Sequence, residues 1–397
     1  MKTMRRWRWL RAGALACAVA GAWAWPGWPD ARGQDFAPPQ RTPDGFLVPQ
    51  PGRRFEFPRD HGRHDGFKIE WWYVTGQVTT GDGRELGYQL TFFRNAGPSP
   101  ATGHDAPSPS LFAHAPLHLA HCAVADVAGG RFLHESRINR EGWDASAAQE
   151  TLRVRNGAWS LVRTTAGGGP ETFELRAGVR GDASLELRLV AEKPVVAFGT
   201  NGVSRKGRDP TASSHYLTFT RLRTEGTARL GGATSTVTGV SWMDHEFSSS
   251  QLEAGQAGWD WACILLDDGS EVMAYRMRRE DGSTDPFSTL AWVGADATPR
   301  HVGPDRFRWE VEGHWTSPLT GARYPNRVQL VAPAREGQGT LTLRLEPLLE
   351  AQEIADPLGG VAYWEGACRV RDASGKVVGR AYLELAGYVG RLRDKFR

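Results

Sequence analysis

Apolar residues in this chain fall into short runs that end at turn residues, and few of them recur at the spacing of a helix. Three pairs of such runs surround a turn that contains glycine: residues 68–78 and 85–94, residues 259–267 and 271–278, and residues 361–371 and 377–385. In the first two pairs the turn is Asp-Gly, which between extended runs is a strong signal of a β-hairpin. The pattern therefore predicts an all-β protein.

The predicted strands divide into two similar halves. Residues 224–235 are rich in glycine and threonine and separate the halves, so we predict one β-barrel domain over residues 61–230 and a second over residues 236–397. Many short strands at regular spacing are typical of barrels and sandwiches. Because both halves repeat the same kinds of hairpin, we expect two small barrels in tandem, related by duplication.

The N-terminus differs from the rest of the chain. Five basic residues lie within the first eleven, an apolar run follows over residues 12–25, and small residues near position 31 suggest a cleavage site. We expect residues 1–33 to be an export signal, which would make the mature protein periplasmic or secreted. A retained membrane anchor is the alternative, although the apolar run is short for a membrane span. Residues 34–60, rich in proline and charge, are expected to form an extended leader.

Removing the signal changes the charge of the protein. Residues 1–33 contain six Lys and Arg residues and one Asp, so the formal net charge falls from +3 to −2 without them. A nearly neutral mature chain gives no indication of nucleic-acid binding. No apolar stretch long enough to span a membrane follows the signal, so we do not expect an integral membrane protein after its removal.

No pattern in the sequence predicts a metal site or a cofactor. Cys122, Cys263 and Cys368 lie far apart and form no Cys-x-x-Cys pair, so we expect small buried residues in strands, with one disulfide as the alternative. The histidines near positions 61–64 and 114–121 would need a rigid frame to bind a metal ion, and the second group contains a proline and a predicted strand. Neither a phosphate loop nor a dinucleotide-binding fingerprint is present.

Three clusters combine large aromatic residues with a carboxylate, at residues 70–73, 259–261 and 363–365. Indole rings fill a barrel or line its pocket. A carboxylate among them can have a raised pKa or can stabilise a cation. The clusters therefore predict that the protein binds an apolar small molecule or a lipid.

Strand geometry limits what two of these carboxylates can do. Side chains alternate between the faces of a strand, so Asp260 points away from Trp259 and Trp261, and we expect it to pair with Arg276 or Arg278. Glu70 shares a face with Trp72, and a pair with Arg94 across the hairpin is expected. For both acids a structural role competes with ligand binding.

The chain resembles a known family in several motifs that occur in the family's order. These are EWWYVTG at residues 70–76 with QLTFFR at 89–94, WMDHEFSS at 242–249 with GWDW at 258–261, and YWEG at 363–366 with YLELAGY at 382–388. They are similar to the AttH-like, carotenoid 1,2-hydratase (hydroxyneurosporene synthase) family, over about residues 45–390. The resemblance implies two lipocalin-like β-barrel domains in tandem. Many members are exported proteins described as secreted hydrolases or transporter accessories.

Three ionisable residues follow Trp242 and are the candidate catalytic group: Asp244, His245 and Glu246. Hydration of an alkene, the activity that the resemblance implies, requires protonation of carbon by an acid that an apolar site keeps neutral. Asp244 or Glu246 would be this acid, with His245 assisting and aromatic faces near the cation. Alternatively, the three residues position a ligand, or they hold the two barrels together.

The remaining candidates follow from the aromatic clusters and the resemblance. The candidate ligand-binding residues are Glu70, Trp72, Tyr216, Trp242, Trp259, Asp260, Trp261 and Trp364. A non-enzymatic carrier of a hydrophobic molecule, working beside an ABC transporter, is the main alternative function. A secreted hydrolase is a weaker alternative, because no Gly-x-Ser-x-Gly or His-Glu-x-x-His motif occurs; a serine triad would need Ser241, His245 and Asp244.

Overall fold

The computed structural model describes residues 36–97, 115–335, 337, 339–355, 361–390 and 392. The predicted export signal lies outside these residues. Within them the chain forms β-strands and one short 3-10 helix, η1 (Arg59–His61), which confirms the all-β prediction. No helix in this part of the chain is long and apolar enough to cross a membrane.

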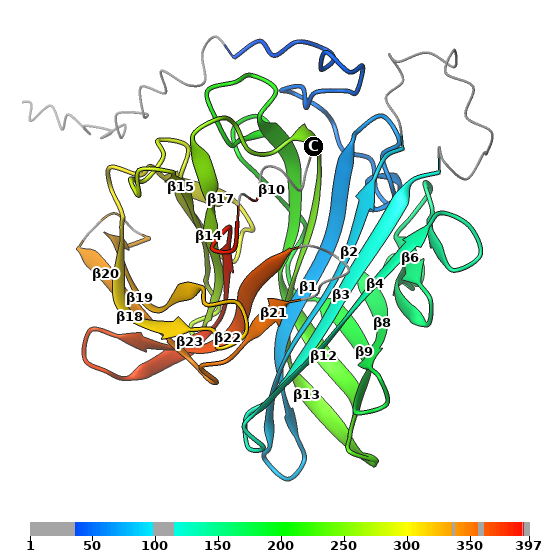
Figure 1. Ribbon diagram of the computed structural model, residues 1–397, viewed down its shortest axis with the longest axis vertical. Coiled ribbons are helices and arrows are strands. Elements are labelled where there is room, and N and C mark those ends of the chain that lie inside the picture. Colours follow the sequence, from blue (N-terminus) through cyan, green and yellow to red (C-terminus); the bar gives the residue numbers. More distant parts are fainter. Residues whose placement is uncertain are drawn as a thin grey trace, which may run out of the picture. The chain divides into compact units, whose positions relative to one another are not determined.

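The first sheet has the strand order β4-β3-β2-β1-β13-β12-β9-β8-β7-β6-β5, and β10 and β11 also pair with β12 (Figure 1). Its strands are β1 (Ile69–Thr80), β2 (Glu85–Asn95), β3 (Leu117–Asp126), β4 (Arg131–Arg140), β5 (Ala145–Ala147), β6 (Arg153–Asn156), β7 (Trp159–Arg163), β8 (Thr172–Val179), β9 (Ala183–Ala191), β10 (Val196–Phe198), β11 (Ser204–Arg205), β12 (Ser213–Leu230) and β13 (Ala233–Ser250). The sheet curls until β3 and β4 contact β6 and β8, so it forms a nearly closed barrel.

The second sheet has the order β17-β16-β15-β14-β23-β22-β20-β19-β18, with β21 paired to β22. Its strands are β14 (Gln256–Leu266), β15 (Glu271–Arg279), β16 (Thr289–Val293), β17 (Pro299–Val302), β18 (Arg308–Thr316), β19 (Arg323–Pro333), β20 (Thr340–Pro347), β21 (Glu353–Ala355), β22 (Ala362–Asp372) and β23 (Val377–Ala386). The three predicted hairpins are β1–β2, β14–β15 and β22–β23, and each is antiparallel as expected.

The region that we expected to separate two domains is instead a long hairpin. β12 and β13 each have 18 residues, and β13 pairs along its length with both β1 and β12 in the first sheet. The second sheet therefore begins at Gln256 and not near residue 236. The glycine- and threonine-rich stretch is the tip of this hairpin, where a turn at Gly231-Gly232 has positive φ angles that glycine adopts without strain.

The described part of the predicted leader runs without a regular strand into η1, apart from an isolated bridge between Arg41 and Leu47. It is anchored to the first sheet, because Phe46 and Val48 are buried and Asp60 is 2% exposed. Trp72 Nε1 in β1 donates a hydrogen bond to the carbonyl of His61 at 3.0 Å. The segment is thus part of the packed structure.

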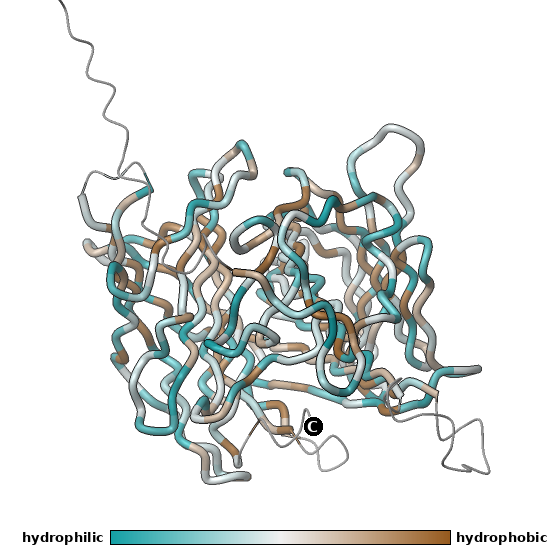
Figure 2. Tube along the Cα trace, turned by 90° about the horizontal axis from the view of Figure 1, so that it is seen from above, coloured by the Kyte–Doolittle hydropathy of each residue, from teal (hydrophilic) through white to brown (hydrophobic). Residues whose placement is uncertain are grey.

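Alternation along the strands produces three layers of buried side chains. One cluster fills the first barrel and contains Trp72, and a second fills the concave side of the second sheet and contains Trp364. A third cluster joins the outer faces of the two sheets and contains Tyr73, Trp242 and Trp261. Figure 2 shows hydrophobic residues interspersed with hydrophilic ones along the tube.

The three cysteines in the described part of the chain are buried and unpaired. Cys122, Cys263 and Cys368 lie in β3, β14 and β22, so the prediction of small buried strand residues is confirmed and the alternative of a disulfide among them is not realised. Burial raises the pKa of the Cys122 thiol to about 12, which keeps it in the unreactive form.

A buried ion cluster also connects the two sheets. Glu271 in β15 accepts hydrogen bonds from Lys193 Nζ and from Arg221 Nε of the first sheet, both at 2.6 Å. Lys193 Nζ also donates to the carbonyl oxygens of Gly269 and Gly294, at 2.7 and 3.1 Å. These contacts fix the second sheet against the β9–β12 side of the first.

We expect Glu271→Ala to lower the free energy of unfolding by about 2 kcal/mol, because two largely buried cations lose their carboxylate but keep carbonyl partners. Urea unfolding of the purified protein measures this change. Glu174→Ala, at an exposed position of β8, is the matched control and should change stability by less than about 0.5 kcal/mol. Equal stability of both variants would show that the cluster contributes nothing to the fold.

Candidate functional site

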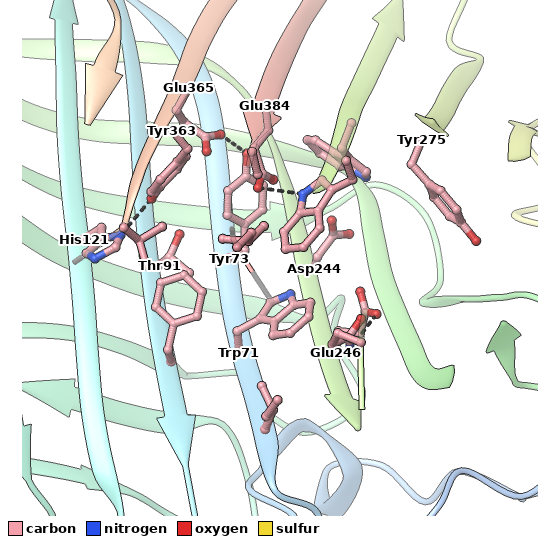
Figure 3. A pocket seen from close by; sticks show the side chains of 18 of the residues that line it. Trp71, Tyr73, Thr91, His121, Asp244, Glu246, Tyr275, Tyr363, Glu365 and Glu384 are labelled. Atoms are coloured by element: carbon pink, nitrogen blue, oxygen red, sulfur yellow. Dashed lines mark hydrogen bonds between the residues drawn. The ribbon is translucent and has the colours of Figure 1, made fainter. Parts of the chain in front are cut away.

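A pocket of about 180 Å³ lies between the two sheets, outside both barrel cores. β1, β2, β3, β12 and β13 of the first sheet and β14, β15, β22 and β23 of the second sheet contribute to its walls. Eight of the 24 lining residues are aromatic: Trp71, Tyr73, Phe93, Tyr216, Trp259, Trp261, Tyr275 and Tyr363. Figure 3 shows carboxylates and phenols from both sheets pointing into this space.

Strand alternation decides which residues reach the pocket. In β1, Trp71 and Tyr73 line it, whereas Trp72 points into the first barrel. In the neighbouring β13, Asp244 and Glu246 line it, and His245 between them points to the opposite side. Tyr73 is the register partner of Asp244, and Trp71 is that of Glu246, so the two strands present aromatic rings and acids side by side.

Asp244 accepts more side-chain hydrogen bonds than any other acid in the lining of the pocket. Its Oδ1 accepts hydrogen bonds from Thr218 Oγ1 and Trp242 Nε1, both at 2.7 Å, and its Oδ2 accepts one from Tyr216 Oη at 2.8 Å. The indole N–H of Trp261 in turn donates to Tyr216 Oη at 3.0 Å. Burial raises the pKa of Asp244 to about 7 although the three donors favour the ionised form, and the charge of Glu246 raises it further.

The hydrogen bonds also determine where a proton can reside on Asp244. Two donors occupy both lone pairs of Oδ1, whereas Oδ2 accepts only one hydrogen bond within the described structure. The second lone pair of Oδ2 is therefore the position that can carry the acidic proton. Since Asp244 lines the pocket, this position can face a bound molecule.

Glu246 differs from Asp244 because it has a cationic partner. Lys206 Nζ lies 3.2 Å from Glu246 Oε1, and it also lies 4.9 Å and 4.4 Å from the ring centroids of Tyr216 and Tyr275. Burial opposes the charge of Lys206, but Glu246 and Tyr275 outweigh it and raise the pKa of Lys206. The pair therefore places one fixed ammonium group at this end of the pocket.

Two further acids come from the last hairpin of the second sheet. Glu365 in β22 and Glu384 in β23 are register partners; Glu365 is fully buried and Glu384 is partly buried. Trp259 Nε1 donates to Glu384 at 2.9 Å, and Tyr73 Oη donates to Glu365. Burial raises the pKa of Glu384 to about 7, with Asp244 and Glu246 adding to it. Burial and the neighbouring Glu384 raise the pKa of Glu365 well above its usual range.

A hydrogen-bonded pair of His121 and Tyr363 also lines the pocket. His121 Nδ1 lies 2.8 Å from Tyr363 Oη, and burial raises the pKa of this phenol well above its ordinary value. The phenol therefore stays protonated. The pair thus offers a bound molecule a phenol that keeps its proton.

The structure brings together part of the predicted set of residues. Asp244, Glu246, Tyr216, Trp259 and Trp261 line the pocket. Trp242 shares their region and holds Asp244 through its indole N–H, but it is fully buried behind the pocket surface.

The other predicted residues lie elsewhere. Trp72 and Trp364 are in the cores of the two sheets. Asp260 pairs with Arg276 and with Arg278, as predicted from the strand pattern, and its side chain is on the face of β14 away from the pocket. These three residues cannot contact a molecule held between the sheets.

His245 cannot assist Asp244, because its ring lies on the barrel side of β13. It stacks on Trp72 with the ring centroids 4.9 Å apart, and its Nε2 lies 2.9 Å from Glu70 Oε1. The predicted Glu70–Arg94 pair is present at 3.1 Å, so Glu70 also belongs to this buried group and not to the pocket. The serine triad is not assembled either, since Ser241 bonds to Tyr88 and Thr224.

One group of possible metal ligands occurs among the described residues, formed by His64, Glu70 and His245. Glu70 Oε1 already bonds to both imidazoles, and the second ring nitrogen of His64 lies 3.0 Å from Asp60 Oδ1. Arg53 and Arg94 supply the positive charges that balance Asp60 and Glu70. We therefore interpret the group as a charge network that holds the leader segment to β1 and β13.

We expect Lys206→Met to raise the pKa of Asp244, because the carboxylate of Glu246 would then lack its ammonium partner beside Asp244. The fluorescence of Trp242, which donates to Asp244, provides the measurement: the midpoint of its pH titration should move up from about 7. Lys206→Arg keeps the charge and should keep the midpoint. An unchanged midpoint in Lys206→Met would show that Lys206 has no influence on Asp244.

Sequence reasoning identified two of the four acids that line the pocket, Asp244 and Glu246, and missed Glu365 and Glu384. Glu365 and Tyr363 belong to a cluster that was singled out, but the tryptophan between them was selected instead. Glu384 lies in the YLELAGY motif of the last hairpin, on the same strand face as Tyr382. The alternation of side chains along this strand could have indicated Glu384 as a candidate. His121 was considered within a possible group of metal ligands. No signal in the sequence marks Lys206, which reaches the pocket only through the fold.

The fold and pocket define an all-β protein of two sheets that enclose an acid-bearing aromatic pocket between them. Residues 48–388 match the model of the AttH-like family, and the chain belongs to that family. A search of curated proteins found no match.

Three solved structures share the architecture, and they support the predicted lipocalin-like two-domain fold. A protein from Nitrosomonas europaea assigned as AttH is 34% identical, with a TM-score of 0.74 over 87% of this chain and 100% of its own. Kievitone hydratase from Nectria haematococca is 12% identical, with a TM-score of 0.62 over 88% of this chain and 97% of its own. CghA bound to Sch210972 is 13% identical, with a TM-score of 0.50 over 88% and 98%. The last two show the fold alone.

Proposed function

We propose that the protein binds an apolar small molecule between its two sheets and adds water to a carbon–carbon double bond of that molecule. The observation that carries this proposal is Asp244, a buried carboxyl group among aromatic rings with a pKa of about 7 and a free lone pair on Oδ2. An acid of this strength can hold a proton at neutral pH and can also release it.

The reaction would proceed in two steps that balance in atoms and charge. The proton of Asp244 Oδ2 moves to one alkene carbon, which leaves a carbocation on the other carbon and a carboxylate on Asp244. Water then adds to the cation and gives its extra proton to the carboxylate of Glu384. Proton exchange with solvent then returns Asp244 to its acid form and Glu384 to its ionised form. The reverse sequence would dehydrate a tertiary alcohol.

The pocket supports the cationic intermediate of this reaction. The rings of Trp261 and Tyr216 lie next to Asp244, and their faces attract positive charge. Glu384, held by Trp259, provides a second carboxyl group of matched acidity that can accept the proton of the attacking water. A fixed acid on each sheet would allow protonation and water attack from different sides of the substrate.

The proposal is tested with isotopes, because the substrate is not known. The purified protein is incubated with a panel of small branched alkenes and tertiary alcohols in D2O and in H2-18O, and mass spectrometry follows the products. Deuterium on carbon together with 18O in the alcohol, above the level with heat-denatured protein, is the expected result. A panel that includes every bound molecule extracted from the native protein and shows neither isotope in any product would refute hydration.

A second candidate function is that of a non-enzymatic carrier of a hydrophobic molecule that works beside an ABC transporter. The eight aromatic side chains that line a pocket of about 180 Å³ favour this role as well, since binding requires no acid. Solvent extraction of the native protein followed by mass spectrometry distinguishes the two. A carrier releases a molecule unchanged after incubation, whereas a hydratase converts it.

We also propose that the protein is exported to the periplasm or secreted, on the basis of the N-terminal signal pattern. Expression of the full chain followed by cell fractionation tests this proposal. The expected mature protein begins close to residue 34 and appears outside the cytoplasm. Recovery of an uncleaved chain with the membrane fraction would instead identify the segment as an anchor.

A further inference from the structure

The pocket contains an excess of carboxyl groups over cations. Four acids line it, and only Glu246 has a cationic partner there, at 3.2 Å from Lys206. Asp244, Glu365 and Glu384 form no ion pair with any residue that the structure describes; their partners are hydroxyl and indole donors. The other cation in the lining, Arg94, is paired with Glu70 on the barrel side.

Aromatic faces surround the three acids. Trp259 donates to Glu384, Tyr73 donates to Glu365, and the Trp261–Tyr216 pair leads to Asp244. A carboxylate among aromatic faces is the environment that recognises ammonium groups in proteins, because the ring quadrupoles and the anion both attract positive charge. Lys206, which lies over Tyr216 and Tyr275 at one end of the pocket, already illustrates this attraction inside the protein.

We propose that the pocket is a binding site for organic cations with an apolar body, such as a quaternary ammonium or a protonated tertiary amine. The ligand's charge would lie between the acids contributed by β13 and by β22–β23, and its apolar part would pack against the indole rings of β1 and β14. The proposal rests on the acids and rings of the pocket alone, so it does not depend on whether the pocket hydrates an alkene.

The size of the pocket agrees with a ligand of this kind. An engineered cavity of about 150 Å³ is known to hold benzene in another protein. The present pocket, at about 180 Å³, therefore accommodates one ring with a compact substituent. A trimethylammonium group attached to a phenyl ring has such a shape.

Binding of a cation would be coupled to proton release. A protonated carboxyl group must lose its proton before it can neutralise the charge of the ligand. Because the pKa values of Asp244 and Glu384 are about 7, either group can do this near neutral pH. The charged and titratable groups around Asp244 are Glu246, Lys206, Tyr216 and Cys263. Those around Glu384 are Asp244, Glu246 and Glu365, and the charge of Asp260 on the other face of the sheet also raises the pKa of Glu384. The pKa values of Asp244 and Glu384 are both about 7, so these two carboxyls titrate near neutrality.

The direction of the pH effect follows from this coupling. At pH 8 the two carboxyls are largely ionised and meet the cation without further cost. At pH 5.5 they hold their protons, so a ligand that requires one ionised carboxyl should bind about 30-fold more weakly. A neutral ligand of the same shape gains nothing from ionisation, and its affinity should not rise with pH.

The test compares phenyltrimethylammonium with tert-butylbenzene, which has the same shape without the charge. Quenching of tryptophan fluorescence measures both affinities, and calorimetry in buffers of different ionisation enthalpy measures the protons released. At pH 8 we expect phenyltrimethylammonium to bind at least about 10-fold more tightly than tert-butylbenzene. Binding of the cation near pH 7 should release protons. Equal affinities, or affinity for the cation that does not rise with pH, would overturn the proposal.

Variants assign the effect to the pocket. Glu384→Gln and Asp244→Asn should each weaken binding of the cation by about 10-fold while tert-butylbenzene binds as before. The two acids are on different sheets, so failure of one variant to fold leaves the other informative. Glu174→Gln, an exposed change on β8, should have no effect. If the cation binds equally well to both pocket variants, its site lies elsewhere and the proposal is wrong.

Discussion

Asp244→Asn should lower the rate of alkene hydration by about 10³-fold, because the amide cannot donate a proton to carbon. The variant should fold and bind, since Asn has the same shape and its amide oxygen can keep the hydrogen bonds from Thr218 and Trp242. Its amide nitrogen would face the hydroxyl of Tyr216, which must then rotate, at a cost of about 1–2 kcal/mol in stability. Turnover is measured by 18O incorporation into the alcohol, and folding by the midpoint of urea unfolding.

The pH dependence of the wild-type reaction supports the same assignment. The reacting form of Asp244 is the protonated one, and its pKa is about 7, so turnover should decline as the pH rises through 7. Asp260→Asn is the matched control, because Asp260 is a buried acid whose side chain lies on the opposite face of its strand. Turnover by Asp244→Asn within about tenfold of wild type would exclude this residue as the acid.

Glu70→Gln should lower the free energy of unfolding by about 3–5 kcal/mol, because Arg94 would be left buried without a counter-charge. Glu70 is fully buried, and Arg94 is 2% exposed. The carboxylate also accepts the backbone N–H of His64 at 2.9 Å, so the leader segment would lose an anchor to β1. Denaturant unfolding followed by fluorescence measures the change.

The pKa of Glu70 gives a second measurable consequence. Burial acts to raise it, but hydrogen bonds from His245 and His64 and the charge of Arg94 outweigh burial and hold it well below its ordinary value. A depressed pKa in the folded state contributes stability above the pKa of the unfolded chain, and this contribution is lost as the pH falls toward the folded value. The wild type should therefore become less stable below about pH 4, and Glu70→Gln should show less of this loss.

A double variant separates lost pairing from lost packing. Arg94→Met in the Glu70→Gln background removes the unpaired charge, so part of the stability should return. Should the double variant be less stable than Glu70→Gln alone, the cost would come from packing around Arg94 and the account of an unpaired charge would fail.

Strand alternation explains both the success and the failure of the sequence reasoning about the aromatic clusters. Each cluster indicated a place where a strand carries rings and acids. The pocket was expected inside a barrel, and so Trp72 and Trp364 were selected although they fill the cores. Their neighbours Tyr73 and Glu365 face the pocket and bond to each other across the two sheets. For Asp260 the alternation was applied, and the predicted arginine partners are the observed ones.

The role of His245 also depends on which face of the strand its side chain occupies. Asp244, His245 and Glu246 are adjacent in sequence, and adjacency suggested a common site. Within β13 the imidazole points to the barrel and the two acids point to the pocket, so a strand separates groups that a loop could have brought together.

The sequence by itself determined the strands, the three hairpins at glycine turns, the family and the concentration of acids among aromatic rings. These features depend on residues close together in the chain, and local backbone preferences and motifs record them. Only the tertiary structure decided that β13 completes the first sheet and that the pocket lies between two sheets. That pocket consists of outer faces that meet through contacts such as Tyr73 with Glu365, 292 residues apart, and no local pattern specifies how two sheets pack against each other.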